Sequence, residues 1–385
     1  MASSYPMASI AMGALAAFIM ATCVGTVLAR VGFPVTPAER RLGCVDGLRG
    51  YLALSVLVHH FVVWLQVTRL GGTWSPPAVN ILNNIGAGSV ALFFMITGFV
   101  FYPRVLNGFV RNAWPAICVG RIFRIVPLII VSVCIIIGII AWRGRASVDG
   151  SLPSALLQWI TSWGEPPLLG YPDTGRLNAY VLWSLWYEWL FYLLILPACA
   201  LVMDLIRGRL PSWLLPLALW AAAPAAERFH LLGELHRFMP LFAIGMLAYE
   251  CRKRSRIRQL LASRWMGIVA ILALLIGLNS APTPYGLVPM LLCGVFFVAV
   301  TCGNDLYGLL CAPGALVLGD CSYGIYLLHG VVLSLLLVDA APVTGLLTTR
   351  QLPALLPIAA FAVVCTTAVT FLLIERPAIW AGRRL

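Results

Sequence analysis

Two adjacent histidines interrupt an otherwise apolar stretch, LRGYLALSVLVHHFVVW, at residues 48–64. Ionisable side chains inside such a helix are costly to bury and usually serve a function. If the helix begins just after Arg49, His60 lies about 16 Å from its start at 1.5 Å per residue. Arg49 stands eleven positions earlier, three turns to within about 20°, so it shares a face with His60, whereas His59 points about 100° away. We therefore expect His60 to be functional and His59 structural.

The alternative is that His60 is itself structural and hydrogen-bonds a neighbouring carbonyl, while Arg49 extends toward the membrane surface. The shared face of the two residues favours a joint function. Asp46 stands three residues before Arg49 and is within pairing reach of it if the helix extends back that far.

A carboxylate occupies a similar depth in a second apolar segment, which contains WSLWYEWLFYLLILP at residues 183–197. Glu188 lies about eight residues, or roughly 12 Å, from the outer end of that segment, so its depth overlaps that of His60. A carboxylate there should be neutral or paired, and a histidine–carboxylate pair can hold an imidazole as a general base. We expect Glu188 to lie beside His60; a structural hydrogen bond and a transporter's proton site are the alternatives. Most of the surrounding aromatic residues are expected to form a membrane-interface belt: Trp183, Trp186, Tyr187 and Trp189.

A pair of arginines precedes another apolar segment. In RIFRIVP, Arg121 and Arg124 are spaced i,i+3. Beside Arg49, their guanidinium groups are suited to hold the phosphates of an anionic cofactor, because the planar fork matches phosphate geometry. A basic flank that orients the segment in the membrane explains the spacing equally well.

Three further motifs place polar side chains in or beside apolar segments. FFMITGF puts Thr97 before a glycine in mid-segment, which usually indicates close helix packing. DCSYGIYLLHG puts His329 about seven residues into its segment, after Ser322 and Tyr323, and core packing is the favoured interpretation of this histidine. IERP ends the last segment with Glu375 and an arginine, which we expect to form a structural clamp.

Composition identifies the class of protein. The 385 residues are 61% hydrophobic and 10% charged, with a mean hydropathy of +0.94, whereas soluble domains carry roughly 25% charged residues. The sequence therefore predicts an all-α, polytopic bundle of membrane-spanning helices in contact with the lipid bilayer. The net charge of +12 is not taken as a sign of nucleic-acid binding, because the basic residues gather between the apolar segments. The eleven cysteines fall in spans or cytoplasmic segments, so no disulfide framework is expected, and no spacing indicates a metal site.

Eleven apolar segments are candidate spans, since about 20 residues cross a bilayer. They lie at 8–28, 50–68, 85–103, 125–142, 180–204, 213–227, 237–250, 265–280, 286–302, 323–338 and 354–375. The segments at 213–227 and 237–250 are short, and they predict either short crossings or a re-entrant pair. No basic residue precedes the first segment, so we expect a retained span rather than a cleaved signal peptide.

Charge between the segments predicts their orientation. With the N-terminus outside, 19 of the 26 basic residues fall on the cytoplasmic side and 7 outside, which agrees with the positive-inside rule. We therefore expect a multi-pass protein of the cytoplasmic (inner) membrane, with an outer N-terminus and a cytoplasmic C-terminus. The longest outer loop, about 143–179, is rich in Pro, Gly and Trp and is a candidate lid or acceptor-binding surface.

Seven pieces of the sequence, in order, resemble the acyltransferase family 3 membrane proteins over about residues 46–377. They are DGLRG (46–50), His60, FFMITGF (93–99), RIFRIVP (121–127), WSLWYEWLFY (183–192), SYGIYLLH (322–329) and ERP (375–377). Two features depart from the family pattern: Thr97 replaces the usual serine, and the segment at 8–28 precedes the usual ten. We therefore expect an extra span and cytoplasmic linker at 1–45, an acyltransferase domain at 46–385, and no fused soluble domain.

The resemblance implies transfer of an acyl group, commonly acetyl from acetyl-CoA, to a hydroxyl of a glycan or small molecule. Arg49 and His60 match the family's essential Arg and His, with His60 as general base or acyl acceptor. Glu188 would orient the imidazole or compensate its charge, and Asp46 joins this catalytic set. Arg49, Arg121 and Arg124 would hold the CoA phosphates. The candidate substrate-site residues are Thr97, Trp183, Ser322, Tyr323 and His329.

The expected partners are therefore acyl-CoA, a surface or lipid-linked saccharide, and proteins of glycan biosynthesis or export. A different class of protein fits the same ionisable residues: a proton-coupled transporter in which His60 and Glu188 form a relay. A non-catalytic membrane scaffold is a third hypothesis. The sequence shows no internal repeat of the kind found in many transporters, which favours the acyltransferase.

Overall fold

The computed structural model describes residues 5–36, 43–144, 146–148, 150–229 and 233–384. Within these residues every regular element is a helix, apart from one isolated bridge between Leu168 and Tyr171. The expectation of an all-α protein is therefore confirmed for the described part of the chain.

In the described part of the first half, four helices are long, α1 to α4, and two are short, α5 and α6. The helices α7 and α8 join through the π-helical turn η2 into one rod of 25 residues. The bounds are α1 (Met7–Arg30), α2 (Cys44–Arg69), α3 (Asn80–Asn107), α4 (Trp114–Trp142), α5 (Leu152–Thr161), α6 (Thr174–Leu177), α7 (Leu182–Leu190), η2 (Phe191–Ile195) and α8 (Leu196–Ile206).

The helices of the second half are shorter and more often interrupted. Its bounds are α9 (Leu214–Ala221), α10 (Ala223–Arg228), α11 (Leu235–Lys253), α12 (Ser255–Leu261), α13 (Arg264–Asn279), α14 (Leu287–Thr301), η3 (Leu309–Cys311), α15 (Pro313–Asp320), α16 (Ser322–Ser334), η4 (Leu335–Asp339), α17 (Ala341–Thr344), η5 (Leu352–Leu355), α18 (Leu356–Thr370), η6 (Phe371–Glu375) and α19 (Arg376–Gly382). The last four elements form one continuous rod of 31 residues.

Seven described helices are long and apolar enough to cross a membrane, or eight if the bent pair α12–α13, with its 73° break, is one span. Seven of the eleven expected segments lie in these helices, and the segment at 265–280 lies in the bent pair. The count of eleven is not confirmed. The expected span at 213–227 is divided between α9 and α10, of 8 and 6 residues, each less than half of the roughly 30 Å that a span must cover. The expected spans at 237–250 and 286–302 lie in α11 and in the 15-residue α14, which are not among the seven.

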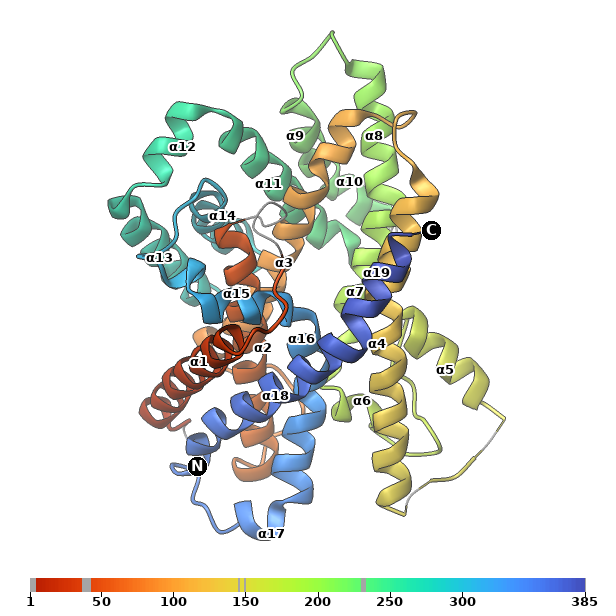
Figure 1. Cartoon of the computed structure of the whole chain (residues 1–385), viewed down its shortest axis with the longest axis vertical. Coiled ribbons are helices and arrows are strands. Elements are labelled where there is room, and N and C mark those ends of the chain that lie inside the picture. The colour runs from red at the N-terminus through yellow and green to blue at the C-terminus, as the bar shows by residue number, and fades with distance from the viewer. Residues whose placement is uncertain (1–4, 37–42, 145, 149, 230–232, 385) are drawn as a thin grey trace.

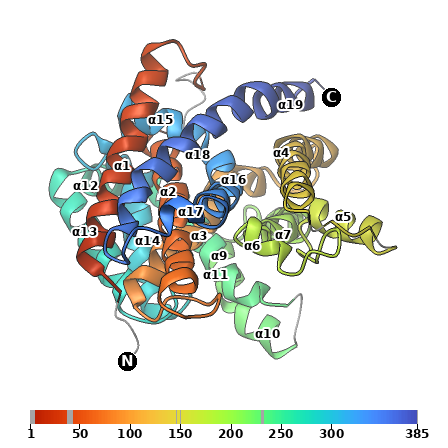
Figure 2. The same ribbon diagram turned by 90° about the horizontal axis from the view of Figure 1, so that it is seen from below.

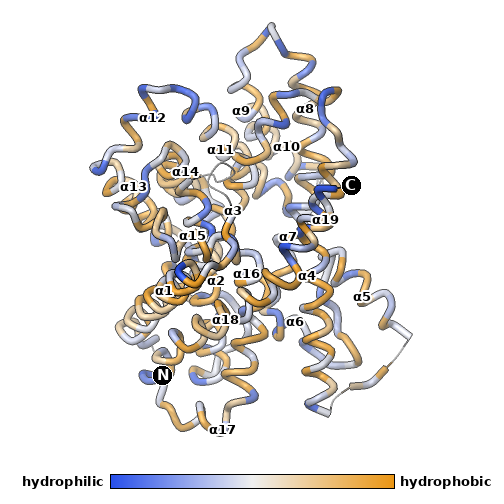
Figure 3. Tube along the Cα trace, viewed as in Figure 1, coloured by the Kyte–Doolittle hydropathy of each residue, from blue (hydrophilic) through white to orange (hydrophobic). Residues whose placement is uncertain are grey.

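Three of the helices that carry the polar motifs occupy the middle of the bundle. Figures 1 and 2 show α2, α3 and α16 between α1 and α13 on one side and α4 and α5 on the other. In α2 and α3 more than 70% of the apolar window is buried, against 28% in α1. Hydrophobic residues dominate α1, α4 and α18, whereas hydrophilic ones gather at α12 and at the C-terminus (Figure 3). The two central helices can therefore hold polar groups away from lipid.

Two motifs place glycines where helix backbones meet. In DGLRG, a Cβ at Gly47 would overlap the carbonyl oxygen of Leu310, and one at Gly50 would collide with Leu318. These glycines let α2 contact η3 and α15 closely on either side of Arg49. In FFMITGF, a Cβ at Gly98 would overlap the carbonyl oxygen of Phe242, so the predicted close packing occurs between α3 and α11.

The segment between α4 and α7 is fixed to the bundle by a partly buried carboxyl, that of Glu165. Asn178 donates a hydrogen bond from Nδ2 to Glu165 Oε1 (2.9 Å), and the backbone amide of Leu182 donates to the same oxygen (3.3 Å). Trp163 stacks on Trp186 at 6.0 Å between ring centroids. The loop is thereby held against the first turn of α7.

Candidate active site

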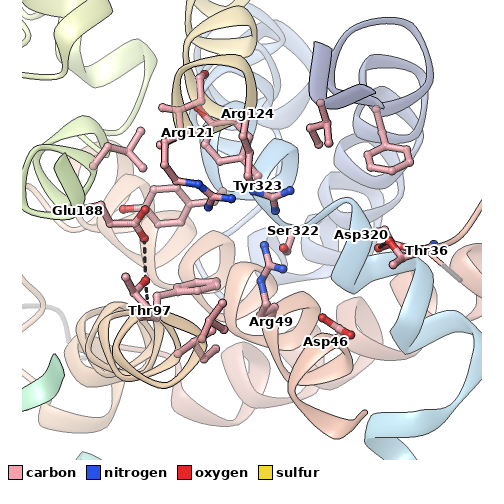
Figure 4. Close-up of a pocket in the computed structure, with 18 of the residues that line it drawn as sticks. Thr36, Asp46, Arg49, Thr97, Arg121, Arg124, Glu188, Asp320, Ser322 and Tyr323 are labelled. Carbon is pink, nitrogen blue, oxygen red and sulfur yellow. Dashed lines mark hydrogen bonds between the residues drawn. The ribbon is translucent and has the colours of Figure 1, made fainter. Parts of the chain in front are cut away.

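A cavity of about 880 Å³ opens among α2, α3, α4, α7, α16 and α19. Among the described residues, five arginines and three carboxylates line it, so its charge is net positive. Arg49 comes from α2, and Arg121 and Arg124 come from α4. Figure 4 shows these three guanidinium groups converging from the two helices. This placement is consistent with the prediction from the sequence that the three arginines share one site. The remaining charged lining residues are Asp46, Glu188, Asp320, Arg376 and Arg383.

Glu188 belongs to this arginine-lined cavity. Its carboxylate accepts hydrogen bonds from Tyr192 Oη (3.0 Å) and Thr97 Oγ1 (3.4 Å), and it interacts electrostatically with all three arginines. Arg121 lies over the rings of Phe101 and Tyr192, with its guanidinium carbon 5.1 and 5.6 Å from their centroids. These contacts hold the guanidinium in place, and the cavity retains more positive than negative charge.

His60 has a partner that the sequence did not indicate. Its Nδ1 lies 2.9 Å from His329 Nε2 and 3.1 Å from the carbonyl oxygen of Val56. His329 is completely buried, and its Nδ1 lies 3.1 Å from the carbonyl oxygen of Ile325. The favoured interpretation of His329 as a core residue captures its burial but misses this contact with His60.

The expected pair of Glu188 with His60 is absent from the hydrogen bonds of the described residues. The reason is the packing of α7 on α16. Ser184 of α7 lies 2.7 Å from Tyr326 of α16, hydroxyl to hydroxyl. From that level Glu188 is four residues away in one direction and His329 three residues away in the other. These offsets separate the two side chains by about 10 Å along the helix axes at 1.5 Å per residue.

Aromatic rings surround the histidine pair. His60 lies nearly parallel to the rings of His329 (5.0 Å between centroids, 29°) and Trp74 (6.4 Å, 17°). His59 meets His60 edge-on at 4.9 Å, and its Nδ1 lies 3.0 Å from the carbonyl oxygen of Leu82. The bond to Leu82 agrees with the structural role expected for His59. Trp74 follows the C-terminal end of α2, whereas Arg49 lies near its beginning.

One residue connects the cavity to the histidine pair. Tyr326 lines the cavity, with its ring 6.0 Å from Phe93 and 6.3 Å from the His329 ring. Its hydroxyl donates to the carbonyl oxygen of Val181 (3.1 Å). Neither His60 nor His329 is among the described residues that line the cavity. Tyr326 and Phe93 therefore form the inner end of the cavity, with the two histidines beyond them.

Comparison with known proteins identifies the family to which the chain belongs. The family model described as "Acyltransferase domain" represents acyltransferase family 3. It matches residues 42–375, which is most of the chain. The chain belongs to this acyltransferase family. Nodulation protein 10 of Rhizobium leguminosarum bv. viciae is 26% identical over 330 residues, which cover 76% of this chain and 83% of that protein. No solved structure gives a significant match. Family and apolar helices together indicate a multi-pass membrane protein that transfers acyl groups.

The remaining expected site residues of the acyltransferase fall in different places. Asp46, Thr97, Ser322 and Tyr323 line the cavity. The Tyr323 hydroxyl donates to the carbonyl oxygen of Ile125 (2.8 Å), which ties α16 to α4. Trp183 is not among the described lining residues; its ring packs on Tyr187 and Phe238. Its assignment to the substrate site stays a prediction.

The helix α19 contributes to the site in a way that the sequence motifs did not indicate. Arg376 and Trp380 of this helix line the cavity, as does Arg383 directly after it, although IERP suggested only a clamp. Glu375, which is 2% exposed, interacts electrostatically with Arg124 and Arg49, so the clamp is part of the site. The run of Trp and Arg in the last residues, WAGRR, is the signal that could have indicated it. Among the described residues, no group of His, Cys, Asp and Glu side chains could hold a metal ion.

Proposed function

We propose that this acyltransferase moves an acyl group, chiefly acetyl, from acyl-CoA to a hydroxyl of a surface or exported glycan. The observation that supports the proposal best is the placement of an arginine-lined cavity close to a hydrogen-bonded pair of imidazoles. The cavity suits an anionic donor, and the imidazoles suit the activation of a hydroxyl. Cytoplasmic (inner) membrane location, with the arginine end inside, is part of the proposal.

The donor would occupy the cavity. CoA carries several phosphate charges, and Arg49, Arg121 and Arg124 supply guanidinium forks suited to bidentate phosphate contacts. The indole of Trp380 and the guanidinium of Arg383 at the cavity wall would contact the nucleotide end. The thioester would then point toward Tyr326, with the histidine pair beyond it.

The acceptor would approach His60 from the other end of α2. Trp74 lies there, nearly parallel to the His60 ring, and Tyr180 is 5.9 Å from Trp74 between centroids. Binding sites for small molecules combine such aromatic walls with a few polar groups, and the apolar face of a sugar ring packs well on an aromatic ring. A saccharide hydroxyl placed there would meet the imidazole.

The chemistry follows from the two ligands. His60 would take the proton from the acceptor hydroxyl as its oxygen attacks the thioester carbonyl carbon, a contribution of roughly 10²–10⁴-fold. The C–S bond then breaks, and the proton passes from the imidazolium to the departing CoA sulfur. Two-step transfer through an acyl-histidine is the variant route. A proton relay between His60 and Glu188, which the transporter hypothesis requires, has less support because these residues have different partners and lie at different depths.

The test uses membranes that contain the full chain, labelled acetyl-CoA and an endogenous glycan fraction. Wild type should label glycan, and His60→Ala should not. His59→Ala is the matched control, since it removes the neighbouring imidazole and should keep most activity. All variants are compared at equal membrane levels. Equal labelling by wild type and His60→Ala, or no labelling by either, would overturn the proposal.

A further inference from the structure

We infer that His329 is a positioning residue that fixes the tautomer of His60 and leaves a lone pair on His60 Nε2 for the acceptor hydroxyl. The inference rests on the proposed function, since it specifies how His60 acts as a base. It is carried by three distances and by the complete burial of His329.

The donor and the acceptor of each hydrogen bond can be assigned in turn, starting from the carbonyl oxygen of Ile325. The carbonyl oxygen of Ile325 can only accept, so His329 Nδ1, at 3.1 Å, must donate to it. A neutral imidazole has one N–H, so His329 Nε2 carries a lone pair. His60 Nδ1, at 2.9 Å from that nitrogen, must therefore donate. The single proton of neutral His60 is then on Nδ1, and its Nε2 is free to accept a proton.

A second contact gives the same result independently. The carbonyl oxygen of Val56, 3.1 Å from His60 Nδ1, also can only accept. If the proton of His60 were on Nε2, the lone pair of Nδ1 would face two acceptors, Val56 O and His329 Nε2. His329 has no exposed surface, so water cannot replace its hydrogen bond, and a buried acceptor left unpaired costs about 1–3 kcal/mol.

The described groups that face the pair carry no fixed negative charge. From α2 the neighbour is His59, from the loop after α2 it is Trp74, and from α16 it is Tyr326. Within the described residues, no carboxylate forms a hydrogen bond or ion pair with either histidine. An imidazolium formed on His60 would therefore be stabilised only by neutral hydrogen-bond acceptors. It would readily return its proton to the departing sulfur. His329 keeps the ring oriented during both transfers.

Two substitutions separate positioning from packing. His329→Leu substitutes an apolar side chain of similar size and removes the acceptor nitrogen, whereas His329→Gln offers an amide oxygen near the position of Nε2. We expect His329→Leu to lower kcat for acetyl transfer about 10–100-fold, similar to the loss when a group that orients a metal-bound histidine is removed, with KM for acetyl-CoA unchanged. His329→Gln should recover most of kcat.

Histidine ¹⁵N NMR of the protein in detergent provides a readout that does not depend on turnover. The His60 resonances, assigned by their loss in His60→Ala, should report a protonated Nδ1 and an unprotonated Nε2 in wild type. They should move toward a tautomer mixture in His329→Leu and return in His329→Gln. If His329→Leu does not accumulate, His329→Asn, whose amide is too short to reach His60, replaces it in both measurements.

The outcomes distinguish the inference from the proposed function. If His60→Ala is inactive while His329→Leu keeps the wild-type kcat and the wild-type tautomer, the role of His329 is wrong and the proposed function stands. If His60→Ala itself transfers acetyl normally, the proposed function fails first. If His329→Gln is as inactive as His329→Leu at equal folding, packing rather than hydrogen bonding explains His329, and the inference is overturned.

Discussion

At the scale of single residues, Arg121 is the best-supported anchor for the donor. Its guanidinium lies over two aromatic rings and beside Glu188, so its orientation is fixed before a ligand arrives. A lysine in its place keeps the charge but has neither the planar face nor the fork. We expect Arg121→Lys to raise KM for acetyl-CoA roughly tenfold, the effect of losing about one charge-assisted hydrogen bond, with a smaller change in kcat.

The measurement is steady-state kinetics in membranes with varied acetyl-CoA. Arg111→Lys is the control, because Arg111 precedes α4, is exposed and is not among the residues that line the cavity. A change in kcat alone for Arg121→Lys would contradict a binding role for Arg121.

Glu165 predicts a pH dependence of stability in the loop between α4 and α7. Burial raises the pKa of its carboxyl from 4.5 to about 7, against hydrogen bonds from Asn178 and the Leu182 amide that lower it. The folded protein therefore prefers the protonated carboxyl. This contribution to stability is fully present below pH 4.5 and is lost as the pH rises through about 7.

We expect the melting temperature in detergent to fall between pH 5 and pH 8, and Glu165→Gln to reduce that fall, because glutamine keeps the acceptor oxygen without the charge. Asp173→Asn removes an exposed carboxylate from the same loop and is the control. An identical pH dependence in Glu165→Gln and wild type would show that Glu165 does not titrate in this window.

At the scale of elements, the contact between α7 and α16 fixes the inner end of the cavity. The Tyr326 hydroxyl is held by Ser184 and the Val181 carbonyl, and its ring stands with Phe93 between the cavity and the histidines. A small side chain at 326 would widen this end of the cavity and admit water to the thioester. We expect Tyr326→Ala to increase release of acetate from acetyl-CoA several-fold without acceptor and to lower transfer to glycan.

Tyr326→Phe is the matched control for this prediction, since it keeps the ring and loses only the hydroxyl hydrogen bonds. Acetate release should stay near the wild-type rate in this variant. If Tyr326→Ala releases no more acetate than Tyr326→Phe at equal protein levels, the ring does not protect the thioester.

At the scale of the whole molecule, the sequence predicted an all-helical membrane protein of the right family, and it predicted that Arg49, Arg121 and Arg124 share a site. It placed Glu188 beside His60 because counting residues from the end of each segment does not give the offset of the two helices along their axes. The contact of Ser184 with Tyr326 decides that, and it is a long-range contact with no local signal. The count of eleven spans is not confirmed, because hydropathy did not reveal the break between α9 and α10 or the burial of α11.

The orientation of the protein in the membrane determines from which side the donor and the acceptor reach the site. The arginine cavity includes α19 at the C-terminal end, and the bias of 19 basic residues to 7 predicts that this end is cytoplasmic. Acetyl-CoA is too polar to cross a sealed bilayer. Inside-out vesicles, whose cytoplasmic face is exposed, should therefore consume added acetyl-CoA, whereas sealed right-side-out vesicles should not until detergent opens them. Equal consumption by both preparations before detergent would place the donor entrance on the other face and reverse the proposed orientation, while the partnership of His60 with His329 would be unaffected.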